Sequence, residues 1–184
     1  SPYLLPYRAV ALLELVRQDL DAGRDPEKNE SAARALLTQP SGEPQDAAGR
    51  LKMRLAACEL ELMIGDADAA RAELGRAREL LAKGPVSGVE LRERLLLPTY
   101  RWEIARRFEG TPEERRAARV EVGRAFDELL AQWADTPERR GGIGFLHLSW
   151  RTQIVSAALE AELDAGGDDA ARRALRVLLR TQAL

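Results

Sequence analysis

The chain has 184 residues, of which 45% are hydrophobic, 32% charged and 5% aromatic, and its formal net charge is −2. This charge lacks the basic excess of a nucleic-acid-binding domain, and no apolar run is long enough to span a bilayer or to form a secretory signal. Cys58 is the single cysteine, which excludes an internal disulfide framework and a cysteine-based metal cluster. Ala, Leu, Arg and Glu dominate the composition, and because all four favour helices we expect an all-α protein. Since the sequence has no membrane span, secretory signal or disulfide framework, we expect it in the cytoplasm.

Apolar residues at helical spacing, interrupted by glycine and proline, predict about eight helices that pair as antiparallel neighbours. In chain order, the predicted helices cover residues 3–22, 30–38, 46–64, 66–83, 87–108, 112–133, 145–165 and 168–184. The first should bury a broad face, made of Leu4, Leu5, Val10, Leu12, Leu13, Leu15, Val16 and Leu20. Pro98 lies inside the fifth, where it removes a hydrogen bond and should kink or split the helix.

Several helix ends carry local capping signals. Gly65 should end one helix, and either Asp66 or Asp68 should cap the next by accepting a backbone N–H. Thr111–Glu114 combines a capping threonine, a proline in the first turn and two acids at the positive end of the helix dipole. Ser87–Glu90 has the spacing of a capping box.

An internal near-repeat predicts stacked helical hairpins. Glu59–Leu81 is read as a helix end, a Gly-Asp turn and an Ala-rich helix, and Glu160–Leu179 is a near copy of it. The second helix of three hairpins shares one pattern, a small residue followed by apolar or small residues four and seven positions on. The three sets are Ala70-Leu74-Ala77, Ala118-Val122-Ala125 and Ala171-Leu175-Leu178. Because small residues let two helices approach closely, we predict four stacked hairpins in one domain over residues 1–184.

This pattern resembles the tetratricopeptide repeat, which has glycine at its turn and small residues in its second helix. The family's Trp-x-x-Leu-Gly-x-x-Tyr signature is not present, since other residues occupy its places: Arg54, Ala57, Cys58 and Glu61. The hairpins are also spaced more widely than the family's repeats of about 34 residues. The resemblance implies a TPR-like α-solenoid whose groove binds a protein or peptide. Carried over by position, the groove would be lined by Lys52, Leu55, Glu59, Leu62, Met63, Gln153, Ser156, Glu160 and Leu163.

The two ends of the sequence lead us to expect a piece of a longer protein. The chain begins at Ser1 rather than Met, and it stops in a predicted helix without a glycine or proline signal. The closing Leu-Leu-Arg-Thr-Gln-Ala-Leu, residues 178–184, also resembles the end of helical arrays in bacterial multidomain proteins with a caspase-like CHAT peptidase domain. That resemblance implies that any peptidase activity lies in a domain outside this chain.

No catalytic constellation is visible in the sequence. His147 is the single histidine, and Ser149 lies two positions away, so on a helix the two side chains would point to different faces. Cys58 lies in an apolar run and is interpreted as a small buried hydrophobe rather than a reactive thiol. Metal-ligand spacings and nucleotide-binding glycine patterns are not found, so we expect no metal, no cofactor and no enzyme activity.

Two groups of residues allow both a structural and a functional interpretation. The first is a row of arginines on the last predicted helix: Arg172, Arg173, Arg176 and Arg180. They would either pair with neighbouring acids or form a basic patch for an acidic partner. The second group is the tryptophans on predicted helices, Trp102, Trp133 and Trp150. Packing in the core is favoured for them over stacking on a ligand.

These observations favour a non-enzymatic protein-interaction or regulatory scaffold module. Its partner would be a protein, a peptide or another domain of the same chain, and neither nucleic acid nor a membrane is expected. One alternative is a structural array that packs on a neighbouring domain, such as a peptidase, and a large apolar patch on the last helix would favour it. The other alternative is a small-molecule sensor with a site near Tyr100, Trp102 and His147.

Overall fold

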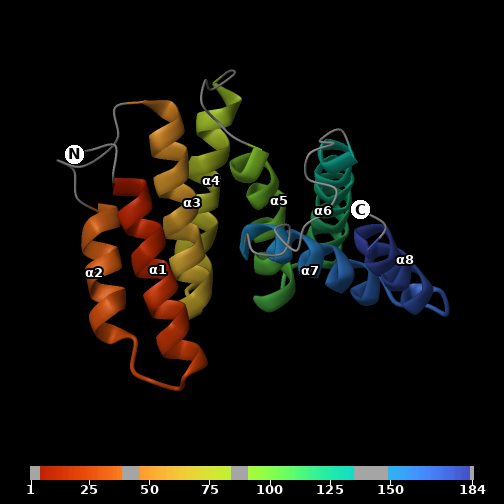
Figure 1. Cartoon of the computed structure of the whole chain (residues 1–184), viewed down its shortest axis with the longest axis horizontal. Coiled ribbons are helices and arrows are strands. Elements are labelled where there is room, and N and C mark those ends of the chain that lie inside the picture. Colours follow the sequence, from red (N-terminus) through yellow and green to blue (C-terminus); the bar gives the residue numbers. More distant parts are fainter. Residues whose placement is uncertain (1–4, 39–45, 84–90, 135–148, 183–184) are drawn as a thin grey trace. The chain divides into compact units, whose positions relative to one another are not determined.

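The computed structural model describes residues 5–38, 46–83, 91–134 and 149–182. Over these ranges the chain forms eight α-helices and no strand, which confirms the predicted all-α class (Figure 1). In chain order they are α1 (Leu5–Asp21), α2 (Glu27–Thr38), α3 (Ala47–Ile64), α4 (Ala67–Ala82), α5 (Leu91–Arg107), α6 (Pro112–Ala134), α7 (Ser149–Asp164) and α8 (Ala170–Gln182). The chain divides into two compact units, residues 1–93 and 94–184, and each unit is described by itself.

Most of the helix ends that the structure describes lie within two residues of the predicted ones. α2 is the exception, since it begins at Glu27 rather than near residue 30. The Asp25 carboxylate accepts the Glu27 N–H at 2.9 Å, so the chain is capped and helical earlier than its apolar spacing indicates. The predicted Ser87–Glu90 capping box and the predicted start of the seventh helix lie outside the described residues.

The turn between α3 and α4 forms as its sequence predicts. Gly65 adopts a left-handed conformation with φ 88°, and its N–H donates to the Glu61 carbonyl at 3.0 Å. The Asp66 N–H donates to the same carbonyl at 2.9 Å, and the Asp66 carboxylate accepts the Ala69 N–H at 3.0 Å. Of the two candidate caps, Asp66 is therefore the one that caps α4. Glycine suits this turn because its backbone enters the left-handed region without steric cost.

The turn between α5 and α6 uses its glycine differently. Here Glu109 takes the left-handed conformation, with φ 53°, and Gly110 lies against the preceding helix. A Cβ atom at Gly110 would come within 2.8 Å of the Ala105 carbonyl oxygen, so this position requires glycine for close approach. Thr111 caps α6, as predicted, and Glu114 completes a capping box with it, in which each side chain accepts the other's backbone N–H, at 3.1 and 2.8 Å.

Pro98 does not split α5, which continues from Leu91 to Arg107. The predicted split is therefore wrong, and the kink, which was the other predicted outcome, stays a prediction. The residues around the proline are buried, among them Leu95, Thr99 and Tyr100, and the Thr99 hydroxyl donates to the Leu95 carbonyl at 2.9 Å. We attribute the unbroken helix to this burial, which offsets the loss of one backbone hydrogen bond.

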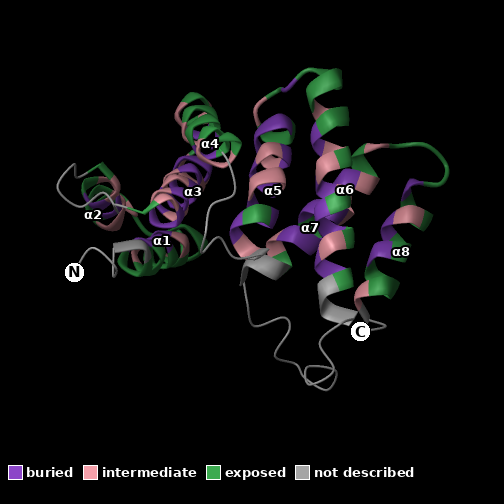
Figure 2. Ribbon diagram, turned by 90° about the horizontal axis from the view of Figure 1, so that it is seen from above, coloured by how far each residue is buried: buried purple, intermediate pink, exposed green. Residues whose placement is uncertain are grey.

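The core of the first unit forms where α1, α2 and α3 meet. α1 packs against α2 and α3, and α3 also packs closely against α4. Figure 2 shows the buried positions on the inner sides of these helices. The core side chains are Ala9, Leu13 and Val16 of α1, Ala33 and Leu36 of α2, and Met53, Ala56 and Leu60 of α3.

The broad buried face predicted for α1 is narrower in the structure. Leu13 and Val16 are buried, but three other members of the predicted face are 39%, 44% and 39% exposed: Val10, Leu15 and Leu20. The reason is that α2 and α3 cover only one side of α1, so a helix with apolar residues all around buries only one stripe. Leu4 and the side chain of Leu5 lie outside the described part of the chain.

In the second unit, α5 and α6 run antiparallel. Arg94 of α5 pairs with Glu128 of α6 at 2.8 Å, and Arg101 pairs with Glu121. Between these two ion pairs the residue number rises by seven in α5 (94 to 101) and falls by seven in α6 (128 to 121), as expected for two helices that run in opposite directions. α6 then packs against α7, and α7 packs against α8.

The repeated stripe is buried in three helices, but its register in α8 differs from the prediction. The buried residues are Ala70, Leu74 and Ala77 of α4, Ala118, Val122 and Ala125 of α6, and Ala170, Ala174 and Val177 of α8. In α8 the predicted set, Ala171-Leu175-Leu178, is exposed instead. The α7–α8 turn contains two left-handed glycines, Gly166 and Gly167, where the α3–α4 turn has one. The buried stripe begins four residues after the first glycine in α8 and five in α4, so counting from that glycine misplaces the α8 stripe by one residue.

Candidate functional site

Three of the predicted groove residues in the first unit contribute to packing. Leu55 and Leu62 of α3 are only 3% and 2% exposed, and Met63 is half-buried against the core of the first unit. The physical reason is that α3 is covered by α1, α2 and α4, so little of its surface stays open. The prediction that Leu55 and Leu62 line a binding groove is therefore wrong, because both are core residues.

The two polar groove residues of α3 engage neighbours inside the first unit. Lys52 Nζ lies 3.9 Å from Oε1 of Glu93, whose side chain is buried. Glu59 forms an ion pair with Arg17 of α1. These charges therefore hold elements of the unit together, and a partner would have to displace them.

The predicted groove residues of the second unit all lie on α7. Ser156 and Leu163 are exposed, and Leu163 is 55% exposed, while Gln153 is half-buried. Glu160 is half-exposed, and its Oε2 lies 3.1 Å from Nε of Arg106 on α5. This set thus keeps two residues open to a partner, Ser156 and Leu163.

The predicted basic patch on α8 divides into two pairs. Arg173 and Arg180 fix α8 in place: Arg173 Nε lies 2.7 Å from Glu162 of α7, and Arg180 Nη2 lies 2.8 Å from Asp127 of α6. The Arg180 guanidinium also lies over the Phe126 ring, 5.3 Å from its centroid. For these two arginines the structure therefore favours the structural interpretation, in which they pair with neighbouring acids.

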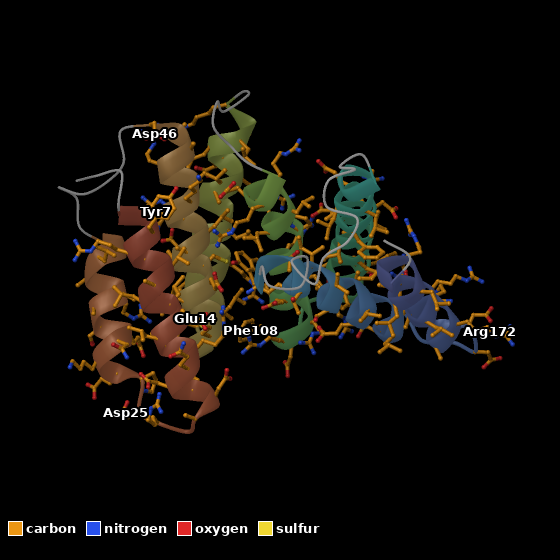
Figure 3. All side chains as sticks on the ribbon, in the orientation of Figure 1. Tyr7, Glu14, Asp25, Asp46, Phe108 and Arg172 are labelled. Carbon is orange, nitrogen blue, oxygen red and sulfur yellow. The ribbon has the colours of Figure 1, made fainter. Side chains whose placement is uncertain are left out.

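The other two arginines of the patch face the solvent. The Arg172 side chain is 79% exposed, and its nearest described acid, Asp169, lies 3.4 Å away at the start of the same helix. Figure 3 shows Arg172 pointing away from the helices of the second unit. Arg176, one helical turn further on, is exposed as well. These two residues remain open to an acidic partner.

A row of exposed leucines borders these arginines. The leucine face of α8 is defined here as Leu175, Leu178 and Leu179, which are 53%, 43% and 54% exposed. With 3.6 residues per turn, this face lies between the buried stripe of α8 and the row of Arg172 and Arg176. Exposed positions alternate with buried ones along α8 in Figure 2. Sequence reasoning missed this face because it assigned the larger leucines, rather than Ala174 and Val177, to the buried stripe.

A buried ion pair was also missed from the sequence. Glu61 of α3 is 7% exposed and accepts two hydrogen bonds from Arg34 of α2, at 2.8 and 2.9 Å. Arg34 also donates to Glu30 at 3.0 Å. Burial raises the pKa of Glu61 above its ordinary value, and the Arg34 guanidinium opposes that increase. The pair joins α2 to α3, and the acceptor carboxylate is buried, so we assign the pair to stability.

Several features bear on catalysis and ligand binding. Cys58 is buried, as predicted, and in the described ranges no group of His, Cys, Asp and Glu could hold a metal ion. Tyr100 and Trp102 are buried, which agrees with the core interpretation of Trp102. His147 and the side chains of Trp133 and Trp150 lie outside what the structure describes. Among the described helices, none is long and apolar enough to cross a membrane.

With the fold and these surfaces established, the chain was compared with known proteins. No protein-family model, curated protein or solved structure matched it.

Proposed function

We propose that the chain is a non-enzymatic protein-interaction module, in which helical hairpins stack as a TPR-like array and a partner protein binds the surface of α8. The recurrence of one buried stripe in α4, α6 and α8 supports the array. The observation that carries the binding function is the leucine face of α8, together with Arg172 and Arg176 beside it.

The leucine face offers a useful amount of binding energy. Fully burying an exposed leucine contributes about 1.5–3 kcal/mol. Roughly half of each side chain is already covered here, so a partner that covers the rest would gain about 1 kcal/mol per leucine. Single exposed leucines are ordinary on protein surfaces, but three adjacent ones bordered by solvent-facing charge have the make-up of a small interface.

The same observation supports a second candidate function, in which the leucine face packs on a neighbouring domain of a longer polypeptide. The two functions differ in whether the covering surface belongs to another chain. A crosslinking experiment separates them, because an adduct between chains has the summed mass and an internal crosslink does not.

The test places a photoreactive benzoylphenylalanine at Leu178 in the protein expressed in its own cells. Leu15 of α1 is the matched control, because it is a mid-helix leucine with almost the same exposure, 44% against 43%. We expect a discrete adduct with another protein from position 178 and not from position 15. The additional substitutions Leu175→Ser and Leu179→Ser should abolish it. Equal labelling from both positions, or no adduct from position 178, would reject the proposed surface.

A further inference from the structure

In the second unit, α6 and α8 are each the second helix of a predicted hairpin, and their residues can be compared position by position. Their buried stripes end at Ala125 in α6 and Val177 in α8. The next residue is Phe126 in α6 and Leu178 in α8, and the one after that is Asp127 or Leu179. In register, therefore, the leucine face of α8, Leu175, Leu178 and Leu179, stands where α6 has Gly123, Phe126 and Asp127.

On α6 the place of Phe126 is buried and that of Asp127 forms an ion pair. Phe126 is 3% exposed, with the Arg180 guanidinium over its ring, and Asp127 pairs with the same arginine. α7 packs against α6 as well. The fold thus shows one way in which an apolar residue at this place is covered, by a cationic side chain of α8, while the adjacent Asp127 side chain stays 62% exposed. On α8 the corresponding Leu178 and Leu179 are 43% and 54% exposed.

The charge beside the leucine face defines the complementary partner. Arg172 and Arg176 are one turn apart, and each lies three residues before a leucine of the face, Leu175 or Leu179. Residues three apart are neighbours on a helix surface, so a row of arginines runs alongside a row of leucines. A helix seated on the leucines would place one of its own edges against these arginines.

We infer that the leucine face of α8 binds an amphipathic α-helix of a partner protein, whose apolar stripe covers the three leucines and whose acidic residues pair with Arg172 and Arg176. This inference rests on the proposed interaction function and names the chemistry of the partner. An acidic helix is favoured over an anionic membrane because one side of α8 is occupied by α7, which leaves only a narrow apolar face. Interfacial helices insert a wide apolar face into the bilayer.

The test uses two fluorescent peptides of about 18 residues and the full chain. In both, leucines recur at helical spacing of three and four residues; the flanking positions are glutamate in one peptide and lysine in the other. Fluorescence anisotropy should show that the acidic peptide binds roughly tenfold more tightly than the basic peptide at low salt, and that this preference shrinks at about 0.5 M salt. The double substitution Arg172→Glu/Arg176→Glu should reverse the preference.

Matched variants test the apolar part of the contact. Leu178→Ser should weaken binding of the acidic peptide about tenfold, whereas Leu15→Ser, at an equally exposed position, should leave it unchanged. Circular dichroism of each variant verifies that the helices are retained. Binding that is indifferent to peptide charge, or unaffected by Leu178→Ser, would overturn the inference.

Two further measurements distinguish other occupants. If vesicles of anionic phospholipid bind the chain through Leu178 and the acidic peptide does not, the inference is overturned in favour of a membrane. If Leu178→Ser dissolves a dimer seen by sedimentation, the occupant is a second copy, which also overturns it. A crosslink from position 178 without any preference for the acidic peptide would leave the interaction function standing and reject only the acidic helix.

Discussion

Replacing Arg34 with methionine should destabilise the first unit more than replacing its partner Glu61 with glutamine. In Arg34→Met the aliphatic stem is kept, but the Glu61 carboxylate, whose side chain is 9% exposed, loses both of its hydrogen bonds from Arg34. Breaking a fully buried ion pair costs about 3–5 kcal/mol. Because the Arg34 side chain is itself 42% exposed, solvent reduces this cost, and we expect about 2–3 kcal/mol at pH 7.

Glu61→Gln should cost less, about 1 kcal/mol, because the glutamine carbonyl still accepts a hydrogen bond from Arg34 and no buried charge remains. The asymmetry between the two variants is the diagnostic feature, since an ordinary surface ion pair would give small effects for both. Urea unfolding followed by circular dichroism measures the loss. Fluorescence of the tryptophans, all of which lie in the second unit, shows whether the effect is confined to the first.

The pH dependence of the Arg34→Met penalty provides a second test. Burial raises the pKa of Glu61, so the native state binds a proton more readily than the unfolded state, and stability falls as pH rises through the raised pKa. Removing Arg34 removes a group that lowers this pKa. The penalty of Arg34→Met relative to the wild type should therefore shrink as the pH falls through the raised pKa of Glu61 and this carboxyl becomes protonated. Equal small penalties for the two variants, or a penalty that does not change with pH, would refute the argument.

Three other substitutions test local features. Gly110→Ala should lower stability by more than 1 kcal/mol, by roughly the cost of overpacking, because its Cβ would meet the Ala105 carbonyl oxygen at 2.8 Å; an unchanged melting temperature would contradict this packing. Thr111→Ala should cost about 1 kcal/mol through the lost cap, and a double cycle with Glu114→Ala should reveal coupling between them. Trp102→Ala should cost about 3–5 kcal/mol, since the side chain is fully buried, and a near-neutral unfolding midpoint would rule out its core placement.

Short-range features of this fold could be predicted from the sequence. The Gly65-Asp66 turn and the Thr111–Glu114 capping box each depend on interactions between residues a few positions apart, so the residue types alone indicate them. Prediction was weaker where the outcome depends on which neighbours cover a helix. The apolar residues of α1 and the leucines of α3 look alike in sequence, yet α3 is covered on several sides and α1 on one.

The candidate site was harder to predict for the same physical reason. In α8 two stripes overlap, one of alanine and valine and one of leucine, and hydrophobicity favours burying the leucines. The structure buries the alanine and valine stripe instead, after a turn with two left-handed glycines, and a count of residues from the first glycine does not reveal this. The burial of Glu61 likewise depends on Arg34, which lies 27 positions earlier in the chain.

The most direct test of the proposed function is a measurement of which face of α8 is buried. Two single variants, Ala174→Cys and Leu178→Cys, are labelled with a thiol-specific reagent in the native protein, with buried Cys58 as an internal protected reference. The structure places position 174 at 7% exposure and position 178 at 43%. We predict that Leu178→Cys reacts at least about tenfold faster than Ala174→Cys, since alkylation requires an accessible thiolate. Fast labelling of Ala174→Cys with protection of Leu178→Cys would show that the leucine face is buried, as the sequence predicted. This result would contradict the proposed function.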